Sequence, residues 1–324
     1  MLTDVPQPST QQSAQDAYGA VGRSEWMDVD WPRHLRWVRV EGRWINYVDI
    51  GEGPVALMIH GLSGCWQNWL ENIPHFARDH RVIAIDLPGF GESELPAKTI
   101  SISRYADTVD AFLKELEITE AVRLIGNSMG GFIGAELAIR YPERVERLVL
   151  AAAAGLSVEK VRTDRREGLR HRAENIAFFQ IGWLASRSPT ITRRRRLREW
   201  LLLLVAAHPA RLSPELTLEL VKGSGKDGFN DALEALCRYP IRSRLKEIEC
   251  PTLIVWGEKD RLVPPKDATV FEELIEDSRK IMYTDTGHLT MLERPARFNA
   301  DVHAFLQEPP GEERPESGAR SFAT

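Results

Sequence analysis

Residues 122–130 read VRLIGNSMG, and this stretch decides the fold. An apolar run ends at Gly126, Ser128 follows, and a helical pattern begins after Gly130. The form G-x-S-x-G, placed between a strand and a helix, is a sharp turn that lifts its serine clear of a sheet. We expect a strained backbone angle at Ser128, where the chain turns sharply. Glycine is needed two residues before and two residues after it, because larger side chains there would collide. The stretch therefore predicts an α/β protein with a serine presented at a strand end.

Short apolar runs alternate with helical patterns on both sides of this turn. The runs, each followed by a turn, occupy residues 55–59, 82–85, 122–125, 145–150, 252–256 and 280–283. The helical patterns occupy residues 102–116, 132–141, 265–275 and 295–306. Residues 37–50 alternate around a glycine, which predicts an antiparallel hairpin at a sheet edge. The fold class is therefore α/β, with a mostly parallel central sheet and helices on both faces.

One segment interrupts this rhythm and predicts a separate layer. Residues 156–240 show helical patterns and no convincing buried strand. Within them, residues 159–238 carry 16 basic and 10 acidic side chains, whereas the whole chain has a net charge of -5. We expect an inserted helical cap at 156–240 and a core at 23–155 and 241–307. The polar ends, residues 1–22 and 308–324, are expected to be disordered.

The composition excludes several classes of function. A net charge of -5 does not favour nucleic-acid binding. Three scattered cysteines, Cys65, Cys237 and Cys250, are too few for a disulfide framework or a metal cluster, so no metal is expected. The N-terminus lacks the features of a secretory signal, and no apolar run approaches the ~20 residues that cross a bilayer. We expect a cytoplasmic protein, and the sequence does not indicate its oligomeric state.

A serine hydroxyl needs a base, and His288 is the candidate among eight histidines. It lies on a turn directly after the late run at 280–283 and before a helix. Asp260, in the turn after the run at 252–256, can hold the far nitrogen of His288, with Glu258 as a second candidate. His60 follows an early strand, but its neighbouring glycines favour a structural role in a backbone loop.

Two backbone N–H groups are predicted to face the reacting centre. The helix that begins after Ser128 places the Met129 N–H and a partial positive charge beneath it. The loop His60–Gly64 follows another strand end and supplies the second donor, for which Leu62 N–H is the prediction. Only the backbone matters for this task, so the side chain at position 62 is not diagnostic.

Taken together, these motifs resemble those of the α/β-hydrolase superfamily. The matching pieces are His60-Gly61, residues 86–93 (DLPGFGES), residues 126–131 (GNSMGG), residues 256–260 (WGEKD) and Gly287-His288. The resemblance spans about residues 37–306. It implies that the insertion is a cap that shapes the substrate pocket, and that no cofactor is needed. A small-molecule ester or related acyl compound is the expected partner.

Departures from family patterns narrow the expected reaction. Haloalkane dehalogenases and epoxide hydrolases place aspartate where Ser128 stands, so both are disfavoured. Residues 126–131 resemble carbon–carbon bond hydrolases of meta-cleavage pathways, but those place tryptophan after the catalytic histidine, where Leu289 lies here. Carboxylesterases and monoacylglycerol-type lipases are similar too. We expect ester cleavage through an acyl-enzyme; the alternatives are carbon–carbon cleavage, perhydrolysis or lactone opening, or a non-catalytic ligand receptor on the same fold.

The cap sequence carries weaker signals. Four aromatic residues are predicted either to line the pocket or to form the core of the cap: Phe178, Phe179, Trp183 and Trp200. Arg193–Arg196 precede apolar residues at helical spacing, which favours a cap helix with solvated arginines over one that contacts anionic lipid. Residues 223–228 fit G-x-G-x-x-G but follow a helical pattern rather than a strand, which argues against a dinucleotide site.

Overall fold

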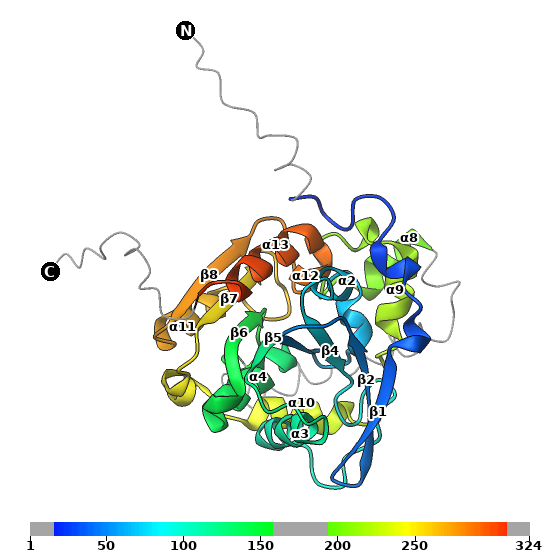
Figure 1. Ribbon diagram of the computed structural model, residues 1–324. Coiled ribbons are helices and arrows are strands. Elements are labelled where there is room, and N and C mark those ends of the chain that lie inside the picture. The colour runs from blue at the N-terminus through cyan, green and yellow to red at the C-terminus, as the bar shows by residue number, and fades with distance from the viewer. Residues whose placement is uncertain (1–15, 158–193, 310–324) are drawn as a thin grey trace, which may run out of the picture.

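The centre of the protein is an eight-stranded sheet, seen in a computed structural model that describes residues 16–157 and 194–309 (Figure 1). The strand order is β1-β2-β4-β3-β5-β6-β7-β8. Strands β3 to β8 pair in parallel, whereas β2 is antiparallel to both β1 and β4. The strands are β1 Leu35–Val40, β2 Arg43–Ile50, β3 Val55–Ile59, β4 Arg81–Ile85, β5 Val122–Asn127, β6 Val145–Ala151, β7 Thr252–Gly257 and β8 Ser278–Tyr283. The predicted parallel sheet and its edge hairpin are confirmed.

The apolar runs form strands because both faces of the sheet are covered. Side chains alternate along β3, so that Leu57 and Ile59 enter one hydrophobic core while Ala56 and Met58 enter the other. All four are fully buried. A strand that is covered by helices on both faces is therefore apolar throughout, whereas a strand with one solvent-exposed face alternates polar and apolar residues.

Helices pack on both faces of the sheet. Helices α3 (Ile102–Glu115), α4 (Met129–Arg140) and α11 (Lys266–Leu274) contribute to one core. Helices α2 (Ile73–Phe76), α12 (Thr290–Glu293) and α13 (Pro295–Leu306) contribute to the other. Short 3₁₀ turns complete the connections: η1 Glu25–Asp28, η2 Trp31–Arg33, η3 Trp66–Trp69, η4 Pro142–Arg144, η5 Pro209–Arg211 and η6 Arg242–Glu247.

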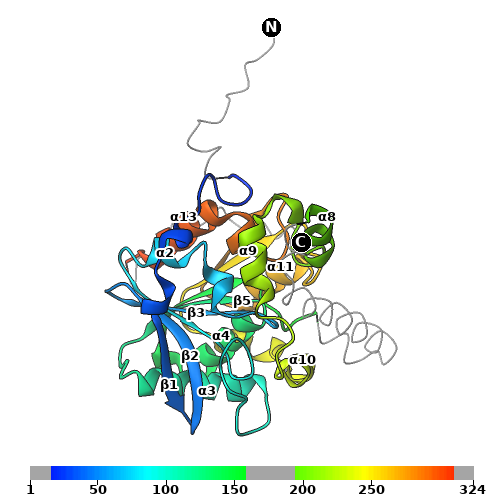
Figure 2. The ribbon, with the colours of Figure 1, turned by 90° about the vertical axis from the view of Figure 1, so that its right-hand side faces the viewer.

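The described part of the predicted cap is helical. It contains α8 (Arg195–Leu201), α9 (Pro214–Val221) and α10 (Phe229–Arg238), and no strand lies within residues 194–240. Figure 2 shows these helices on the same side of the molecule. The domain limits at 156 and 240 stay a prediction, because residues 158–193 lie outside the described residues.

The glycine-rich stretch 223–228 is where the predicted cap meets loops of the core. A Cβ atom on Gly223 would lie 2.5 Å from the carbonyl oxygen of Ser63, and one on Gly228 would lie 2.8 Å from that of Gly89. The Gly228 N–H donates a hydrogen bond to the same Gly89 oxygen at 3.1 Å. These glycines therefore permit close backbone packing, which explains a G-x-G-x-x-G pattern without a nucleotide.

The prediction of a disordered lead over residues 1–22 is too long. Residues 16–22 are described, and Tyr18 among them is only 7% exposed. The polar composition of the segment gave no sign of this, because one aromatic ring and its tertiary contacts are enough to fix it. Residues 1–15 and 310–324 lie outside the described residues.

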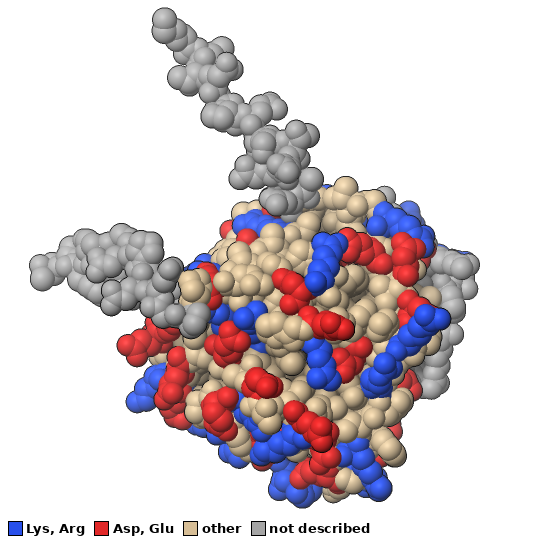
Figure 3. Space-filling model, viewed as in Figure 1, with Lys and Arg blue, Asp and Glu red and all other residues tan. Residues whose placement is uncertain are grey.

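The surface carries both signs of charge. Figure 3 shows acidic and basic side chains interspersed on the face that is viewed in Figure 1. Among the helices of the described chain, none is long and apolar enough to span a membrane.

Phe112 tests the core beneath α3. Its fully buried ring meets Tyr47 of β2 edge to face, with ring centroids 5.2 Å apart. We expect Phe112→Ala to lower the free energy of unfolding by about 3–5 kcal/mol, because it removes buried surface and leaves a cavity. Exposed Glu115 on the same helix is the control, and Glu115→Ala should change that value by less than about 0.5 kcal/mol. Urea unfolding of both variants measures the difference, and equal midpoints would contradict this packing.

Candidate active site

The turn between β5 and α4 holds Ser128 in a strained conformation. Its φ is 55° and its ψ is -117°. A positive φ is unfavourable for serine, so the predicted strain at this position is confirmed. A Cβ atom on Gly126 would lie 2.5 Å from the Gly130 carbonyl oxygen, and one on Gly130 would lie 2.1 Å from the Ile59 carbonyl oxygen. Gly126 is therefore required for the turn to close on itself, and Gly130 is required for it to pack against β3.

His288 and Asp260 form a buried, hydrogen-bonded pair. His288 Nδ1 lies 2.7 Å from Asp260 Oδ2, and the two side chains are 3% and 0% exposed. The other carboxylate oxygen accepts from the N–H groups of Leu262 and Val263, at 2.8 and 2.9 Å. An ionised carboxylate can only accept, so the imidazole proton lies on Nδ1. This leaves the Nε2 lone pair of His288 free to take up a proton.

The Asn127 side chain links the backbone of His288 to the serine turn. Asn127 Nδ2 donates to the carbonyl oxygen of Ala151 at 3.0 Å and to that of His288 at 3.5 Å. The residue before Ser128 thus contacts the histidine directly. Among the described residues, the Ser128 hydroxyl has no hydrogen-bond partner within 3.5 Å. Hydrogen bonds between a nucleophile and its base are often long without substrate and shorten when substrate binds.

The loop after β3 lies against the serine. A Cβ atom on Gly61 would lie 3.0 Å from the Ser128 Cβ, so a side chain at position 61 would be tightly packed against the serine. A hydrogen bond of 3.0 Å from Gly64 N to Gly61 O closes the loop. Within the described chain, neither the Leu62 N–H nor the Met129 N–H donates to another residue. Neither N–H group is therefore engaged by another described residue, and their role as oxyanion donors stays a prediction.

Comparison with known proteins agrees with this architecture. A family model described as "alpha/beta hydrolase fold" matches residues 54–295. The chain belongs to this alpha/beta hydrolase family. It is 32% identical to a 2-hydroxymuconate semialdehyde hydrolase of Pseudomonas sp. (strain CF600), over 81% of this chain and 90% of that protein.

Two solved structures resemble the present chain over most of its length. One is a meta-cleavage product hydrolase from Pseudomonas fluorescens IP01, with 27% identity, a TM-score of 0.65, and coverage of 84% of this chain and 97% of that one. The other is a bacterial membrane phospholipase A, with 29% identity, a TM-score of 0.65, and coverage of 84% and 85%. The relatives thus include enzymes of more than one reaction type.

His60 has the structural role that the sequence predicted. Its Nε2 accepts from the Leu87 N–H at 3.0 Å, and its Nδ1 lies 2.7 Å from the Gly61 carbonyl oxygen, to which it donates. The ring is completely buried, and this burial lowers its pKa to about 4. His60 therefore stays neutral and ties the loop after β3 to the loop after β4.

The aromatic predictions for the cap are tested at one position only. Phe178, Phe179 and Trp183 lie outside the described residues. Trp200 is 53% exposed, whereas Leu201 is 5% exposed. One residue of helix turns a side chain by about 100°, so α8 buries the leucine and not the tryptophan. The alternative that placed Trp200 in the cap core is therefore wrong, and its role in lining the pocket stays a prediction.

Two groups that hold the His288 loop, a backbone carbonyl and a carboxylate, were not predicted from the sequence. The Val205 carbonyl accepts from the N–H groups of His288 and Leu289, at 3.0 and 3.1 Å. Glu293 accepts from the N–H groups on either side of His288. A carbonyl oxygen leaves no trace in a sequence. Glu293 was visible only as an acidic residue between Met291–Leu292 and Pro295, in a segment without helical periodicity.

The low pKa of His60 makes stability depend on pH. The folded-state pKa of about 4 lies below the unfolded value near 6.5, so the contribution of His60 is complete above pH 6.5. It is lost as pH falls toward 4, by roughly 3 kcal/mol in total. We expect the difference in unfolding free energy between wild type and His60→Gln to shrink over this interval. Urea unfolding at matched pH measures it.

Comparison at matched pH also removes the opposing effect of Asp86. Burial raises the pKa of that carboxyl group to about 7, so its contribution is lost as pH rises rather than as it falls. An NMR titration assigned with His60→Gln gives the pKa of His60 directly. A midpoint near 6.5 would show that the ring is not held neutral by burial.

Proposed function

We propose that this chain is a serine hydrolase that cleaves a carboxylic ester through an acyl-enzyme. The supporting observation is the buried His288–Asp260 pair, which leaves Nε2 as a base beside the strained turn of Ser128. The free N–H groups of Met129 and Leu62 add an electrophilic site on the same edge of the sheet.

In the proposed mechanism, the Ser128 oxygen attacks the acyl carbon while His288 Nε2 takes the hydroxyl proton. The negative charge on the former carbonyl oxygen is held by the N–H groups of Met129 and Leu62; loss of one such donor typically costs about 3 kcal/mol of barrier. His288 then returns the proton to the leaving alcohol. Water repeats the sequence and releases the acid, and Asp260 stabilises the imidazolium formed in each half.

Carbon–carbon bond hydrolysis is the second candidate. It is supported by the similarity to the 2-hydroxymuconate semialdehyde hydrolase and by residues 126–131. Against it stands Leu289, a buried aliphatic side chain where the meta-cleavage enzymes place tryptophan. We expect kcat/KM to be higher for p-nitrophenyl butyrate than for 2-hydroxymuconate semialdehyde. The reverse order in parallel assays would replace ester cleavage with carbon–carbon cleavage.

Substitution of Ser128 tests the shared chemistry. We expect Ser128→Ala to lower kcat for p-nitrophenyl butyrate by about 10⁵-fold or more while the protein stays folded, because the nucleophile and its base act as a unit. A fluorophosphonate probe should label wild type and not the variant. Ser103→Ala is the control, because Ser103 lies on α3 and its hydroxyl contacts Glu136 at 3.1 Å.

Wild type and Ser128→Ala together separate an enzyme from a ligand receptor. Activity and labelling that survive in Ser128→Ala would remove this serine from the mechanism. Wild type that resists the probe and leaves every ester intact would favour the non-catalytic receptor.

A further inference from the structure

Glu293, at the end of α12, is a buried carboxylate that the proposed mechanism does not use. Its Oε2 accepts from the Gly287 N–H at 2.8 Å, and its Oε1 accepts from the Leu289 N–H at 3.1 Å. These two N–H groups belong to the residues on either side of His288. One side chain therefore holds the backbone before and after His288.

The same carboxylate reaches the cap. Glu293 Oε2 also accepts from the Ala207 N–H at 2.8 Å. Two residues earlier, the Val205 carbonyl accepts from His288 and Leu289, so the segment 205–207 contacts the histidine loop as an acceptor and Glu293 as a donor. The described cap is thus hydrogen-bonded to the backbone that carries the base.

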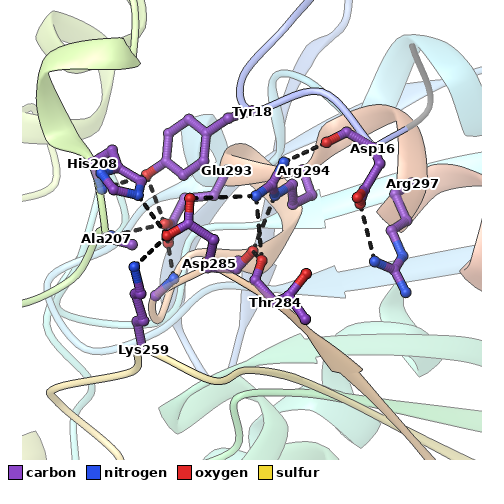
Figure 4. Close-up of polar contacts among 12 residues, drawn as sticks. Asp16, Tyr18, Ala207, His208, Lys259, Thr284, Asp285, Glu293, Arg294 and Arg297 are labelled. Carbon is purple, nitrogen blue, oxygen red and sulfur yellow. Dashed lines mark hydrogen bonds and ion pairs between the residues drawn. The ribbon is translucent and has the colours of Figure 1, made fainter. Parts of the chain in front are cut away.

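A third contact comes from the N-terminal segment. The Tyr18 hydroxyl donates to Glu293 Oε2 at 2.7 Å and accepts from the His208 N–H at 2.9 Å (Figure 4). The Gly19 N–H donates to the Glu293 carbonyl oxygen at 2.8 Å. This segment precedes residues 54–295, the part that the family model matches. Tyr18 therefore lies outside the part of the chain that the family model matches.

Further polar contacts fix the segment that carries Tyr18. The Asp16 carbonyl oxygen accepts from Arg294 Nη1, and its carboxylate pairs with Arg297 at 3.0 Å. The guanidinium of Arg211 lies over the Tyr18 ring, 4.8 Å from its centroid. These contacts fix the chain two residues before Tyr18 and cover one face of its ring.

The chemistry of the four partners requires a carboxylate at position 293. Each of them donates, three to Oε2 and one to Oε1, so an ionised acceptor satisfies all four. A glutamine of the same shape would turn an NH₂ group toward at least one N–H. Burial raises the pKa of Glu293 above its ordinary value, and the four hydrogen bonds limit that rise.

We propose that Glu293 is a positioning residue for His288, and that Tyr18 makes the N-terminal segment part of the same support. The inference rests on the proposed function, because it takes His288 to be the base. A small displacement of the histidine loop would move His288 Nε2 away from the Ser128 hydroxyl and slow proton transfer between them. Substrate binding would stay unaltered. The effect therefore falls on kcat rather than on KM.

Two variants test this proposal, with a fluorophosphonate titration to count functional sites. We expect Glu293→Gln to lower kcat for p-nitrophenyl butyrate by roughly 10²-fold, and Tyr18→Phe by about tenfold, with little change in KM. Tyr18→Phe keeps the ring and removes only the hydroxyl, so it remains informative if Glu293→Gln fails to fold. In both variants, the backbone amides of residues 286–290 should exchange hydrogen faster than in wild type.

Glu71→Gln is the matched control. This half-buried carboxylate also holds the N-terminal segment, through Ser24 Oγ at 2.7 Å and Trp26 Nε1 at 3.0 Å, but its hydrogen bonds do not reach residues 287–289. Both donors reach Oε1, an oxygen that glutamine keeps, so this variant should change the free energy of unfolding little and leave kcat per titrated site unchanged. The proposal is overturned if Tyr18→Phe and Glu293→Gln behave as Glu71→Gln does.

Hydrogen exchange separates this proposal from the proposed function. If wild type hydrolyses no ester and resists the probe, the enzyme assignment fails. Faster exchange at residues 286–290 would still show that Glu293 and Tyr18 hold the loop, and unchanged exchange would overturn that as well.

Discussion

The close approach of two backbones at the serine turn constrains the rest of the molecule. Gly130 packs directly on the carbonyl oxygen of Ile59, so β3, β5 and the start of α4 cannot move apart without losing this contact. The parallel order of β3, β5, β6, β7 and β8 then puts the turns of Ser128, Asp260 and His288 on one edge. A strained backbone at position 128 persists only because the surrounding sheet is fixed in this way.

Most strands and helices of the core could be predicted because each pattern depends on residues that are close together in the sequence. Continuous apolar runs indicated buried parallel strands, and α13 begins at Pro295 and ends at Leu306 as its pattern predicted. The G-x-S-x-G form indicated the turn at Ser128, since steric collisions there involve residues close in the chain. His288 and Asp260 followed from their places after late strands, and the structure brings these two side chains together.

What the sequence did not predict depends on contacts between distant residues. Tyr18 and Glu293 are 275 positions apart, and a polar lead gave no sign that one of its rings is buried. The Val205 carbonyl is a backbone group, so no residue type marks it. For the cap, helical spacing could not tell which side of α8 faces inward, and Trp200 lies on the exposed side.

The glycines at 223 and 228 also decide which caps this scaffold can carry. Each leaves no room for a methyl group between the insertion and the loops at Ser63 and Gly89. A cap grafted from a related enzyme would need glycine, or a chain turning away, at both contacts. Without them, side chains at these contacts would hold the graft away from the core, and bulk solvent would reach the turn that carries Ser128.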